Sequence, residues 1–342
     1  MDKPKRKLRI IALVREDLIP PDTLEGIENK EKEEWRTEYD VVSTLRGMGH
    51  EVHAVGVRSE LSPIRKALEE YKPHVAFNLL EEFDGYPLFD QHVVSYLELK
   101  KQKYTGCGPR GLTLTRDKAL AKKILAYHRI YVPRFAVFPA NRKVQRPNRL
   151  RYPLFVKSVS DEGSAGIAQA SIVRDDEKLK ERVNFIHRQN ETPAIAEEYI
   201  EGREIYVGVI GNERLQAFTP WELIMPKLPD GAANIATGKV KWDIEYQKKV
   251  GLVTQPAELD EQLKKDFQQL SKRVYRILGL TGYARIDYRL SEKGRIYLLE
   301  VNPNPQIAHQ EDFADSAEHC GITYEALLQK IVTLGMSYDP IR

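Results

Sequence analysis

Two short runs of β-branched and aromatic residues near the end of the sequence carry four side chains suited to a metal ion and phosphate. These are Arg285, Asp287, Glu300 and Asn302. Turn residues at 291–294 separate the runs, which predicts a β-hairpin with Leu290 opposite Arg295 and Arg285 opposite Glu300. Side chains alternate across a strand, so all four polar side chains then share one face. Mg²⁺ prefers such oxygen ligands; the alternative is an exposed hairpin face with scattered charges.

Two lysines farther upstream are candidates for binding a polyphosphate. Lys157 ends an apolar run, and a loop of small residues that includes Gly163 and Ser164 follows it. Backbone N–H groups in such a loop, together with a lysine, suit phosphate oxygens. Lys118 follows a turn and is predicted to point into the same cleft. The GxxxxGK[ST] pattern of a P-loop is absent, and a solvated lysine at a strand end is the simpler alternative.

A third set of residues could bind the nucleoside part of a nucleotide. The segment Glu197-Glu198-Tyr199-Ile200 is predicted to be a strand followed by a loop. Its backbone groups could bind an adenine edge, while Tyr199 and Ile200 supply apolar contacts. Glu204 could accept hydrogen bonds from ribose hydroxyls, and the alternative is a charge that faces solvent.

The first third of the chain is expected to position these residues through a parallel sheet. Strands are predicted at 8–14, 51–57 and 74–80, with helices at 33–49, 62–71 and 88–101. This alternation predicts an α/β, doubly wound sheet with helices on both faces. No GxGxxG follows the first strand, so a dinucleotide site is not expected there.

The rest of the chain is predicted to form two further lobes, with α+β character. We place the domains at 1–112, 113–200 and 201–342. The second lobe has a helix through Leu120 and Leu125 and strands at 134–138, 152–157 and 194–200. The third has a strand at 204–210, a long polar loop at 227–247, a helix at 261–278, the hairpin and a last helix at 324–334.

Composition narrows the class of protein. The 342 residues are 42% hydrophobic and 30% charged, with a net charge of +3, which predicts several globular lobes and no nucleic-acid partner. No apolar stretch reaches the length of about 18 residues that a membrane span needs. Cys107 and Cys320 lie far apart without a CxxC motif, so a reduced, cytoplasmic protein is expected.

In this order the motifs resemble the ATP-grasp superfamily, and within it the D-alanine–D-alanine ligase family. The resemblance runs from about residue 74 to the C-terminus. Its motifs are Tyr104-Thr105-Gly106-Cys107-Gly108 with Asp117-Lys118, Phe155-Val156-Lys157 with the loop at 163–166, the 197–204 segment, Lys241-Trp242, Arg285-Ile286-Asp287 and Glu300-Val301-Asn302.

The resemblance implies an ATP-grasp fold in which two lobes hold ATP and Mg²⁺, with Mn²⁺ as an alternative ion. Asp287, Glu300 and Asn302 would bind the metal, and Arg285 and Lys241 would act in catalysis. The nucleotide ligands would be Lys118, Lys157, Gly163, Ser164, Glu197, Glu198, Tyr199, Ile200 and Glu204. A small carboxylate would attack the γ-phosphate to give an acylphosphate, and an amine would then displace phosphate. A homodimer is the habit of the family.

The chain departs from the family where the two D-alanines bind. The glycine–serine–glutamate motif after the first strand is replaced by residues 15–21, and the histidine-bearing loop by 80–85. Gln306 takes the place of an oxyanion glycine, and residues 308–313 replace the serine pair. Glu81, Glu82, Glu311 and Asp312 then favour a cationic acceptor over an amino-acid carboxylate, unless arginines or lysines neutralise them. The alternatives are an authentic D-alanine–D-alanine ligase and a catalytically silent nucleotide-binding module.

Overall fold

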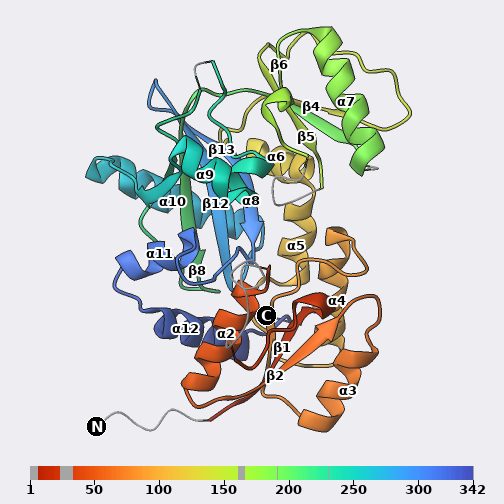
Figure 1. Cartoon of the computed structure of the whole chain (residues 1–342), viewed down its shortest axis with the longest axis vertical. Coiled ribbons are helices and arrows are strands. Elements are labelled where there is room, and N and C mark those ends of the chain that lie inside the picture. Colours follow the sequence, from red (N-terminus) through yellow and green to blue (C-terminus); the bar gives the residue numbers. More distant parts are fainter. Residues whose placement is uncertain (1–6, 24–33, 161–165, 191, 230, 342) are drawn as a thin grey trace.

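The computed structural model describes every residue except 1–6, 24–33, 161–165, 191, 230 and 342. Its elements form three groups along the chain. In Figure 1 the red and orange group lies at the bottom, a green group lies at the upper right, and a green-to-blue sheet lies at the left. Within the described residues, no helix is long and apolar enough to cross a membrane.

The first group is a parallel sheet with strand order β2-β1-β3. Its elements are β1 (Arg9–Arg15), η1 (Glu16–Leu18), α2 (Arg36–Gly47), β2 (Glu51–Val57), α3 (Ser62–Tyr71), β3 (Val75–Asn78), η2 (Pro87–Phe89) and α4 (Asp90–Leu99). Alternation along β1 sends Ile11 and Leu13 towards α3 and α4, and Ile10 and Ala12 towards α2. The predicted doubly wound arrangement, with helices on both faces, is confirmed.

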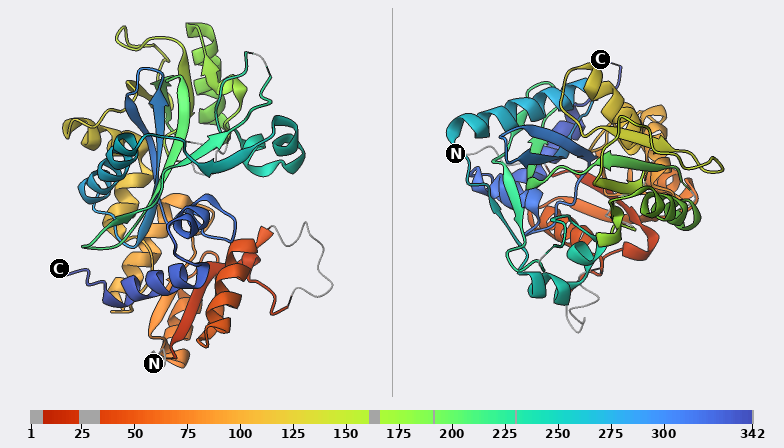
Figure 2. Two further views of the ribbon diagram at one scale, coloured as in Figure 1. Left: turned by 90° about the vertical axis from the view of Figure 1, so that its left-hand side faces the viewer. Right: turned by 90° about the horizontal axis from the view of Figure 1, so that it is seen from above.

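A helix from the far end of the chain completes this first group. α12 (Tyr324–Ser337) packs against α2 and β3, and its Leu327 and Ile331 share an apolar cluster with Ile10 of β1. Figure 2 shows this dark-blue helix beside the red and orange elements. One face of the first sheet is therefore covered jointly by α2 and by a helix from the far end of the chain.

The second group joins two helices to an antiparallel sheet of strand order β4-β7-β5-β6. Its elements are α5 (Pro109–Arg116), α6 (Lys118–Tyr127), β4 (Phe135–Phe138), β5 (Leu154–Ser158), η3 (Gln169–Ser171), β6 (Ile172–Val173), α7 (Asp176–Asn190) and β7 (Ala194–Glu198). α7 was not predicted; its Leu179, Val183 and Ile186 cover the sheet.

The third group is an antiparallel sheet of strand order β11-β10-β8-β12-β13, with β9 paired to β8. Its elements are β8 (Gly202–Ile210), β9 (Gln216–Ala217), β10 (Trp221–Ile224), α8 (Gly238–Trp242), α9 (Ile244–Val250), β11 (Val253–Pro256), α10 (Glu261–Ile277), β12 (Tyr283–Ser291), β13 (Ile296–Pro303) and α11 (Asp312–His319). Ile286 and Tyr288 pack with Phe267 of α10, so the alternate residues Arg285, Asp287 and Arg289 face away from that core.

The predicted polar loop at 227–247 was wrong, because α8 lies inside it and α9 begins there. Both helices begin at side-chain caps. The Thr237 hydroxyl accepts a hydrogen bond from the backbone N–H of Val240, and the Asp243 carboxylate accepts one from Tyr246. Such caps satisfy N–H groups that lack a partner within the helix, and they stabilise short helices with little hydrophobic periodicity.

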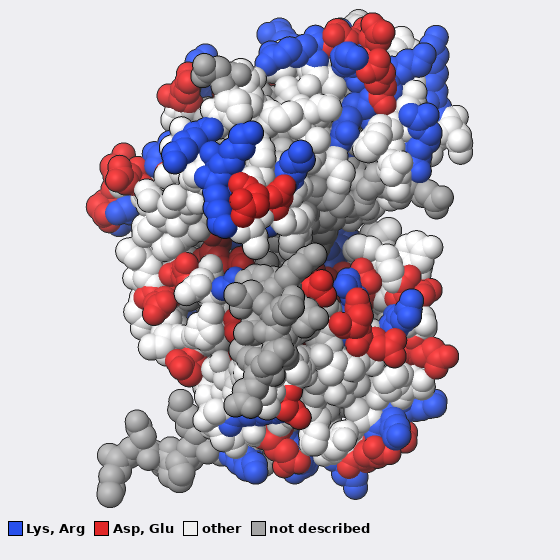
Figure 3. Space-filling model, in the orientation of Figure 1, with Lys and Arg blue, Asp and Glu red and all other residues white. Residues whose placement is uncertain are grey.

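The sheet of the second group has a hydrophobic core separate from that of the other two groups. A single apolar cluster runs from Leu13 of β1 through Tyr104 and Leu112 to Phe267 and Tyr288. The β4–β7 sheet and α7 have a core of their own. The space-filling view in Figure 3 shows a hollow across the middle of the molecule, with acidic side chains on both sides of it.

Candidate active site

The β12–β13 hairpin places its polar side chains on one face, but in a register other than the one predicted. Leu290 lies opposite Ile296 rather than Arg295, and Asp287 rather than Arg285 lies opposite Glu300. The register shifts between Asp287 and Tyr288, because Leu299 forms a β-bulge in β13. The error at the site is two residues, an even number, so all four predicted side chains keep a common face.

Asp287 is the centre of a hydrogen-bonded group on that face. The Arg285 guanidinium donates to both Asp287 carboxylate oxygens, Nε at 2.8 Å and Nη2 at 3.0 Å, and Asn302 Nδ2 donates to Oδ2 at 2.9 Å. The guanidinium also lies 4.5 Å from the Tyr206 ring centroid. Burial disfavours the charge on Arg285, but Asp287 outweighs it and raises the pKa of the guanidinium. Arg285 is therefore a fixed cation, already oriented.

Glu300 is held between two buried lysines. Lys118 Nζ lies 3.2 Å from Oε1, and Lys157 Nζ lies 3.2 Å from Oε2. Burial acts to raise the pKa of the Glu300 carboxyl, but the two ammonium groups prevail and lower it well below its usual range. The structure thus brings together Lys118, Lys157 and Glu300, which come from α6, β5 and β13.

A third lysine in this group was not predicted from the sequence. Lys122 is buried, its Nζ lies 3.2 Å from Glu197 Oε1, and it donates to the carbonyl oxygen of Leu299 at 2.5 Å. It follows Lys118 by one helical turn, and that spacing was the available signal. Lys122 ties the bulge of β13 to the glutamate at the start of the predicted adenine segment.

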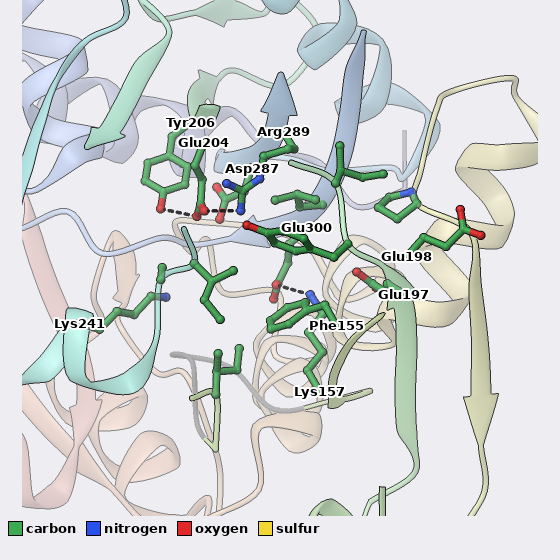
Figure 4. A pocket seen from close by; sticks show the side chains of 17 residues that line it. Phe155, Lys157, Glu197, Glu198, Glu204, Tyr206, Lys241, Asp287, Arg289 and Glu300 are labelled. Carbon is green, nitrogen blue, oxygen red and sulfur yellow. Dashed lines mark hydrogen bonds and ion pairs between the residues drawn. The ribbon is translucent and has the colours of Figure 1, made fainter. Parts of the chain in front are cut away.

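A pocket between the second and third groups collects most of the predicted nucleotide ligands. Figure 4 shows their side chains converging from the β5–β7 sheet on one side and the β8–β12–β13 face on the other. The predicted residues that line it are Lys157, Glu197, Glu198, Tyr199, Ile200, Glu204, Lys241, Asp287 and Glu300. Lining residues not predicted to bind a ligand are Pro133, Phe155, Ile167, Tyr206, Ile235, Ala236, Arg289 and Leu299.

The predicted adenine segment offers fewer backbone donors than expected. The N–H groups of Glu198 and Tyr199 donate to the carbonyls of Arg134 and Pro153, at 2.8 Å and 2.9 Å. These bonds build the sheet rather than a ligand site. Contacts to an adenine edge would therefore come from Ile200 and from the Glu197 side chain.

Glu204 lies in the pocket and does not face bulk solvent. Tyr206 Oη donates to its Oε1 at 2.9 Å, and Arg289 Nη2 donates to its Oε2 at 2.8 Å. Arg289 also donates to the carbonyls of Gly202 and Asn234. A carboxylate has lone pairs beyond these two bonds, so Glu204 can still accept from a hydroxyl.

Lys241 is placed by the helix that was missing from the prediction. It belongs to α8 and lines the pocket opposite the hairpin face. Its desolvation by the pocket walls, together with the nearby charge of Arg285, lowers the pKa of its ammonium group. Its predicted companion Trp242 is 70% exposed, and the predicted loop residues Gly163 and Ser164 lie outside the described residues.

The hairpin face has the donor set of a hard-cation site. Asp287 and Glu300 are direct cross-strand neighbours, and Asn302 bonds to Asp287. No cluster of three His, Cys, Asp or Glu side chains forms a complete metal cage in the described part of the chain. An ion here would need the amide oxygen of Asn302 and oxygens of a phosphate, which is how Mg²⁺ is commonly bound.

The acidic residues predicted near the substrate have arginine neighbours. Arg15 lies 3.9 Å from Glu82, Arg36 lies 3.8 Å from Glu311, and Arg285 lies 3.9 Å from Asp312. Burial raises the pKa of Glu311 to about 7, and the charge of Asp312 adds to this rise. The sequence left open whether arginines or lysines neutralise these acidic residues. The structure shows that arginines do so in part for Glu82, Glu311 and Asp312.

Comparisons with known proteins agree with this geometry. Residues 124–333 match the family model described as D-ala D-ala ligase C-terminus. The D-alanine–D-alanine ligase of Aquifex aeolicus is 30% identical over 293 residues, covering 86% of this chain and 92% of that protein. An uncharacterised protein of Sinorhizobium fredii is 28% identical over 301 residues, 85% of each chain.

The fold resembles that of a solved ligase structure. The D-alanine–D-alanine ligase from Bacillus anthracis complexed with ATP superposes with a TM-score of 0.74 at 21% identity, covering 96% of this chain and 97% of that one.

Proposed function

The chain belongs to the D-alanine–D-alanine ligase family and is an ATP-dependent carboxylate–amine ligase, and from this premise we propose how its residues act. ATP lies in the pocket between the β4–β7 sheet and the hairpin face, and Mg²⁺ lies at Asp287, Glu300 and Asn302. The observation that carries the proposal is the convergence of Lys118 and Lys157 on Glu300, each at 3.2 Å.

The lysines exchange partners when the nucleotide binds. Without ATP, Lys118 and Lys157 share the single carboxylate of Glu300 as their partner. When phosphate oxygens enter, the two ammonium groups turn to them, and Glu300 becomes available as an oxygen ligand. Mg²⁺ held by Asp287, Glu300 and Asn302 would supply further positive charge to offset that of the phosphates. Lys241 adds a third ammonium group from the opposite wall of the pocket.

The chemistry joins two substrates through an acylphosphate. A carboxylate oxygen of the first substrate attacks the γ-phosphorus of ATP, and ADP leaves. The amine nitrogen of the second substrate then adds to the acyl carbon, and inorganic phosphate leaves with the bonding electrons. Arg285 has one guanidinium nitrogen, Nη1, outside its paired bonds to Asp287. We assign Nη1 to the oxyanion that forms during this addition.

A second candidate differs only in its substrates. The curated relative from Aquifex aeolicus is named for joining two D-alanines, which favours the same reaction here. The loops at 15–21, 80–85 and 308–313 lack the family residues for D-alanine, which favours other substrates. By resemblance to the family we also propose a homodimer that acts in the cytoplasm, which size-exclusion chromatography with light scattering and fractionation of the source cells would test.

Trapping the acylphosphate tests the proposed function most directly. Purified protein is incubated with ATP, MgCl₂, hydroxylamine and a panel of carboxylic acids that includes D-alanine. We expect ADP and a hydroxamate to form together with one class of acid. ADP formation that does not depend on any acid would contradict the proposal, and neither ADP nor hydroxamate with the whole panel would favour a catalytically silent nucleotide-binding module. D-alanyl-D-alanine as the preferred product would select the second candidate.

A further inference from the structure

A buried carboxylate on α2 has no neutralising partner among the residues that the structure describes. The side chain of Glu38 is 7% exposed. Within the described residues no other side chain hydrogen-bonds to it or forms an ion pair with it; its own backbone N–H is its donor. The charges that act on it are Glu81, Arg15 and Asp17. Two of these three are negative, so the site attracts positive charge.

Contacts on the opposite side of α2 fix the direction in which Glu38 projects. The Arg36 guanidinium donates to the carbonyl of His309, and Asp40 accepts from the His309 backbone N–H at 3.0 Å. These two residues lie four apart on one helical face, so Glu38 between them projects from the other face. That face meets the loops that follow β1 and β3, where Asp17 and Glu81 lie.

An open cavity of about 410 Å³ lies at the same strand ends. Its walls are Arg15, Glu16, Asp17, Val57, Arg58, Glu82, Asp84 and Gly85. Four of these residues carry a carboxylate and two are arginines, so the cavity walls carry more negative than positive charge. Arg15 is paired with Asp17 through two nitrogens, at 2.6 Å and 2.9 Å. Ligands of open α/β sheets bind at the carboxyl ends of the strands, and this volume is in the range of ligand pockets.

The loop that carries Glu81 links this region to the catalytic face. The Arg116 guanidinium holds the Glu81 carbonyl at 3.2 Å. The Glu81 charge adds to burial in raising the pKa of Tyr283, the first residue of β12. Tyr283 stands two residues before Arg285 in that strand. The loop of Glu81 therefore lies on the side of the first sheet that faces β12, the strand of Arg285.

An unneutralised buried carboxylate is unfavourable unless a ligand pairs with it. Burial, with the charge of Glu81, raises the pKa of Glu38 to about 7. A proton lessens the cost in the free protein, and a bound cation would remove it. The ammonium group that reacts cannot be that cation, because an amine must lose its proton before it attacks the acylphosphate.

We propose, on the basis of the ligase function above, that the amine substrate carries a second positively charged group and that Glu38 binds it together with Asp17 and Glu81. The acceptor class is therefore a diamine, a polyamine or a basic amino-acid derivative. The reacting amine lies at the acylphosphate near Arg285, and the second ammonium or guanidinium group lies at the strand ends of the first sheet.

Matched pairs of acceptors test this inference. With the carboxylate found by hydroxylamine trapping, kcat/KM is measured for 1,4-diaminobutane against 1-aminobutane and for lysine amide against norleucine amide. The comparison is repeated in Glu38→Gln, which keeps the side chain's shape and removes its charge. Glu34→Gln is the matched control, because Glu34 is exposed one helical turn earlier and its substitution changes the net charge equally.

We expect the doubly charged member of each pair to be at least 10-fold better in the wild-type protein and in Glu34→Gln. In Glu38→Gln this ratio should fall towards one, through a higher KM for the charged member. An equal or better neutral member in the wild-type protein, or an unchanged ratio in Glu38→Gln, overturns the inference while the ligase function stands. No hydroxamate with any carboxylic acid overturns the ligase function and the inference together.

Discussion

In the function proposed above, Glu300 has two roles at different stages of binding: it is a counter-ion of the lysines before the nucleotide binds and a metal ligand afterwards. Together with Glu197 it faces Lys118, Lys122 and Lys157 within a buried network. Three ammonium groups against two carboxylates leave one net positive charge. Because buried like charges are costly, this excess charge favours an anionic ligand over an empty pocket. A phosphate chain meets that requirement.

Replacing Glu300 should separate nucleotide binding from turnover. In Glu300→Gln the two lysines lose their internal partner, so metal-free ATP should bind at least as tightly as in the wild-type protein. Turnover should fall by at least about 100-fold, because an oxygen ligand of the metal is lost. Isothermal titration with ATP in EDTA and an ADP-release assay with MgCl₂ measure the two effects. Near wild-type turnover would contradict the metal assignment.

Replacing Lys157 should weaken the nucleotide complex directly. We expect Lys157→Ala to remain folded and to bind ATP about 10–100-fold more weakly, because a charged hydrogen bond contributes about 1.5–3 kcal/mol. Calorimetry measures the dissociation constant. Lys123→Ala is the control, since Lys123 lies in the same region but is exposed. Equal affinities for the two variants would place Lys157 outside the phosphate site.

Replacing Glu38 should make the free protein more stable at alkaline pH. The pKa of Glu38 is raised from its ordinary 4.5 to about 7 in the folded state, so the folded state binds more protons between these values. Its stability therefore falls as pH rises through that range. Glu38→Gln should gain about 1–3 kcal/mol at pH 8 and little below pH 5, as followed by urea unfolding. A variant less stable at pH 8 would contradict the unpaired state of Glu38.

The sequence could identify the residues that supply charge, because their types and spacing are local features. Asp287, Glu300 and Asn302 share a face as predicted. Arg289 and Tyr206 were missed because each reads as an ordinary strand residue. Their place in the pocket depends on the pairing of β8 with β12, a contact between distant segments.

At the scale of elements, the hairpin shows which errors in the predicted strand register still place the site residues on the correct face. The turn is one residue longer than predicted, since Leu290 pairs with Ile296, and Leu299 forms a bulge. Neither feature is visible in a pattern of alternating residues, so the register was predicted wrongly. The face of each side chain depends only on whether the register error is even. Lys122 explains why the bulge lies there, since its Nζ donates to the carbonyl that the bulge exposes.

Helices were predicted well where an apolar face repeats. Strand β2 and helix α3 have the predicted bounds, and α10 ends one residue before the predicted end. α8 has five residues and one buried side chain, too few for periodicity to appear. The capping residues Thr237 and Asp243 are a better sequence signal for α8 and α9 than hydrophobic periodicity is.

Arg289 should act by holding elements around the ribose end of the pocket. It joins Glu204 to the carbonyls of Gly202 and Asn234. We expect Arg289→Met to raise KM for ATP about 10–100-fold, given the worth of charged hydrogen bonds, with a much smaller change in kcat. The measurement is steady-state kinetics with ATP varied, and Arg289→Lys should recover part of the loss.

A matched arginine on the same sheet provides the control for Arg289. Arg203 pairs with Glu222, its Nε 2.7 Å from Oε1, but it belongs to the face of β8 opposite to Glu204. Arg203→Met should leave KM for ATP unchanged. Equal rises in KM for both variants would mean that loss of sheet stability, and not a contact near the nucleotide, explains the result.

At the scale of the whole molecule, the first and third groups form one body. Their apolar cluster is continuous through Tyr104 and Leu112, and α12 belongs to both. The β4–β7 sheet, with its separate core, is the part able to move against that body. Closure around ATP would then be a motion of this sheet alone.

The last helix should contribute strongly to the stability of the first sheet. Ile331 of α12 is fully buried in the cluster that includes Ile10, so Ile331→Ala should lower the free energy of unfolding by about 2–5 kcal/mol. Ile341→Ala is the control, because Ile341 is 94% exposed and the cost should stay within about 0.5 kcal/mol. Urea denaturation measures both, and similar midpoints would show that α12 is dispensable.

The position of α12 also has a consequence for synthesis on the ribosome. β1 to β3 and α2 leave the ribosome first, but on one face Ile10 and Phe77 are covered by α2 alone until the residues of α12 follow. At about 5–20 residues per second, the interval between Asn78 and Tyr324 lasts on the order of tens of seconds. Throughout that time the nascent chain exposes the apolar surface that α12 later covers. We expect a chaperone that binds apolar surfaces to bind this chain before translation ends.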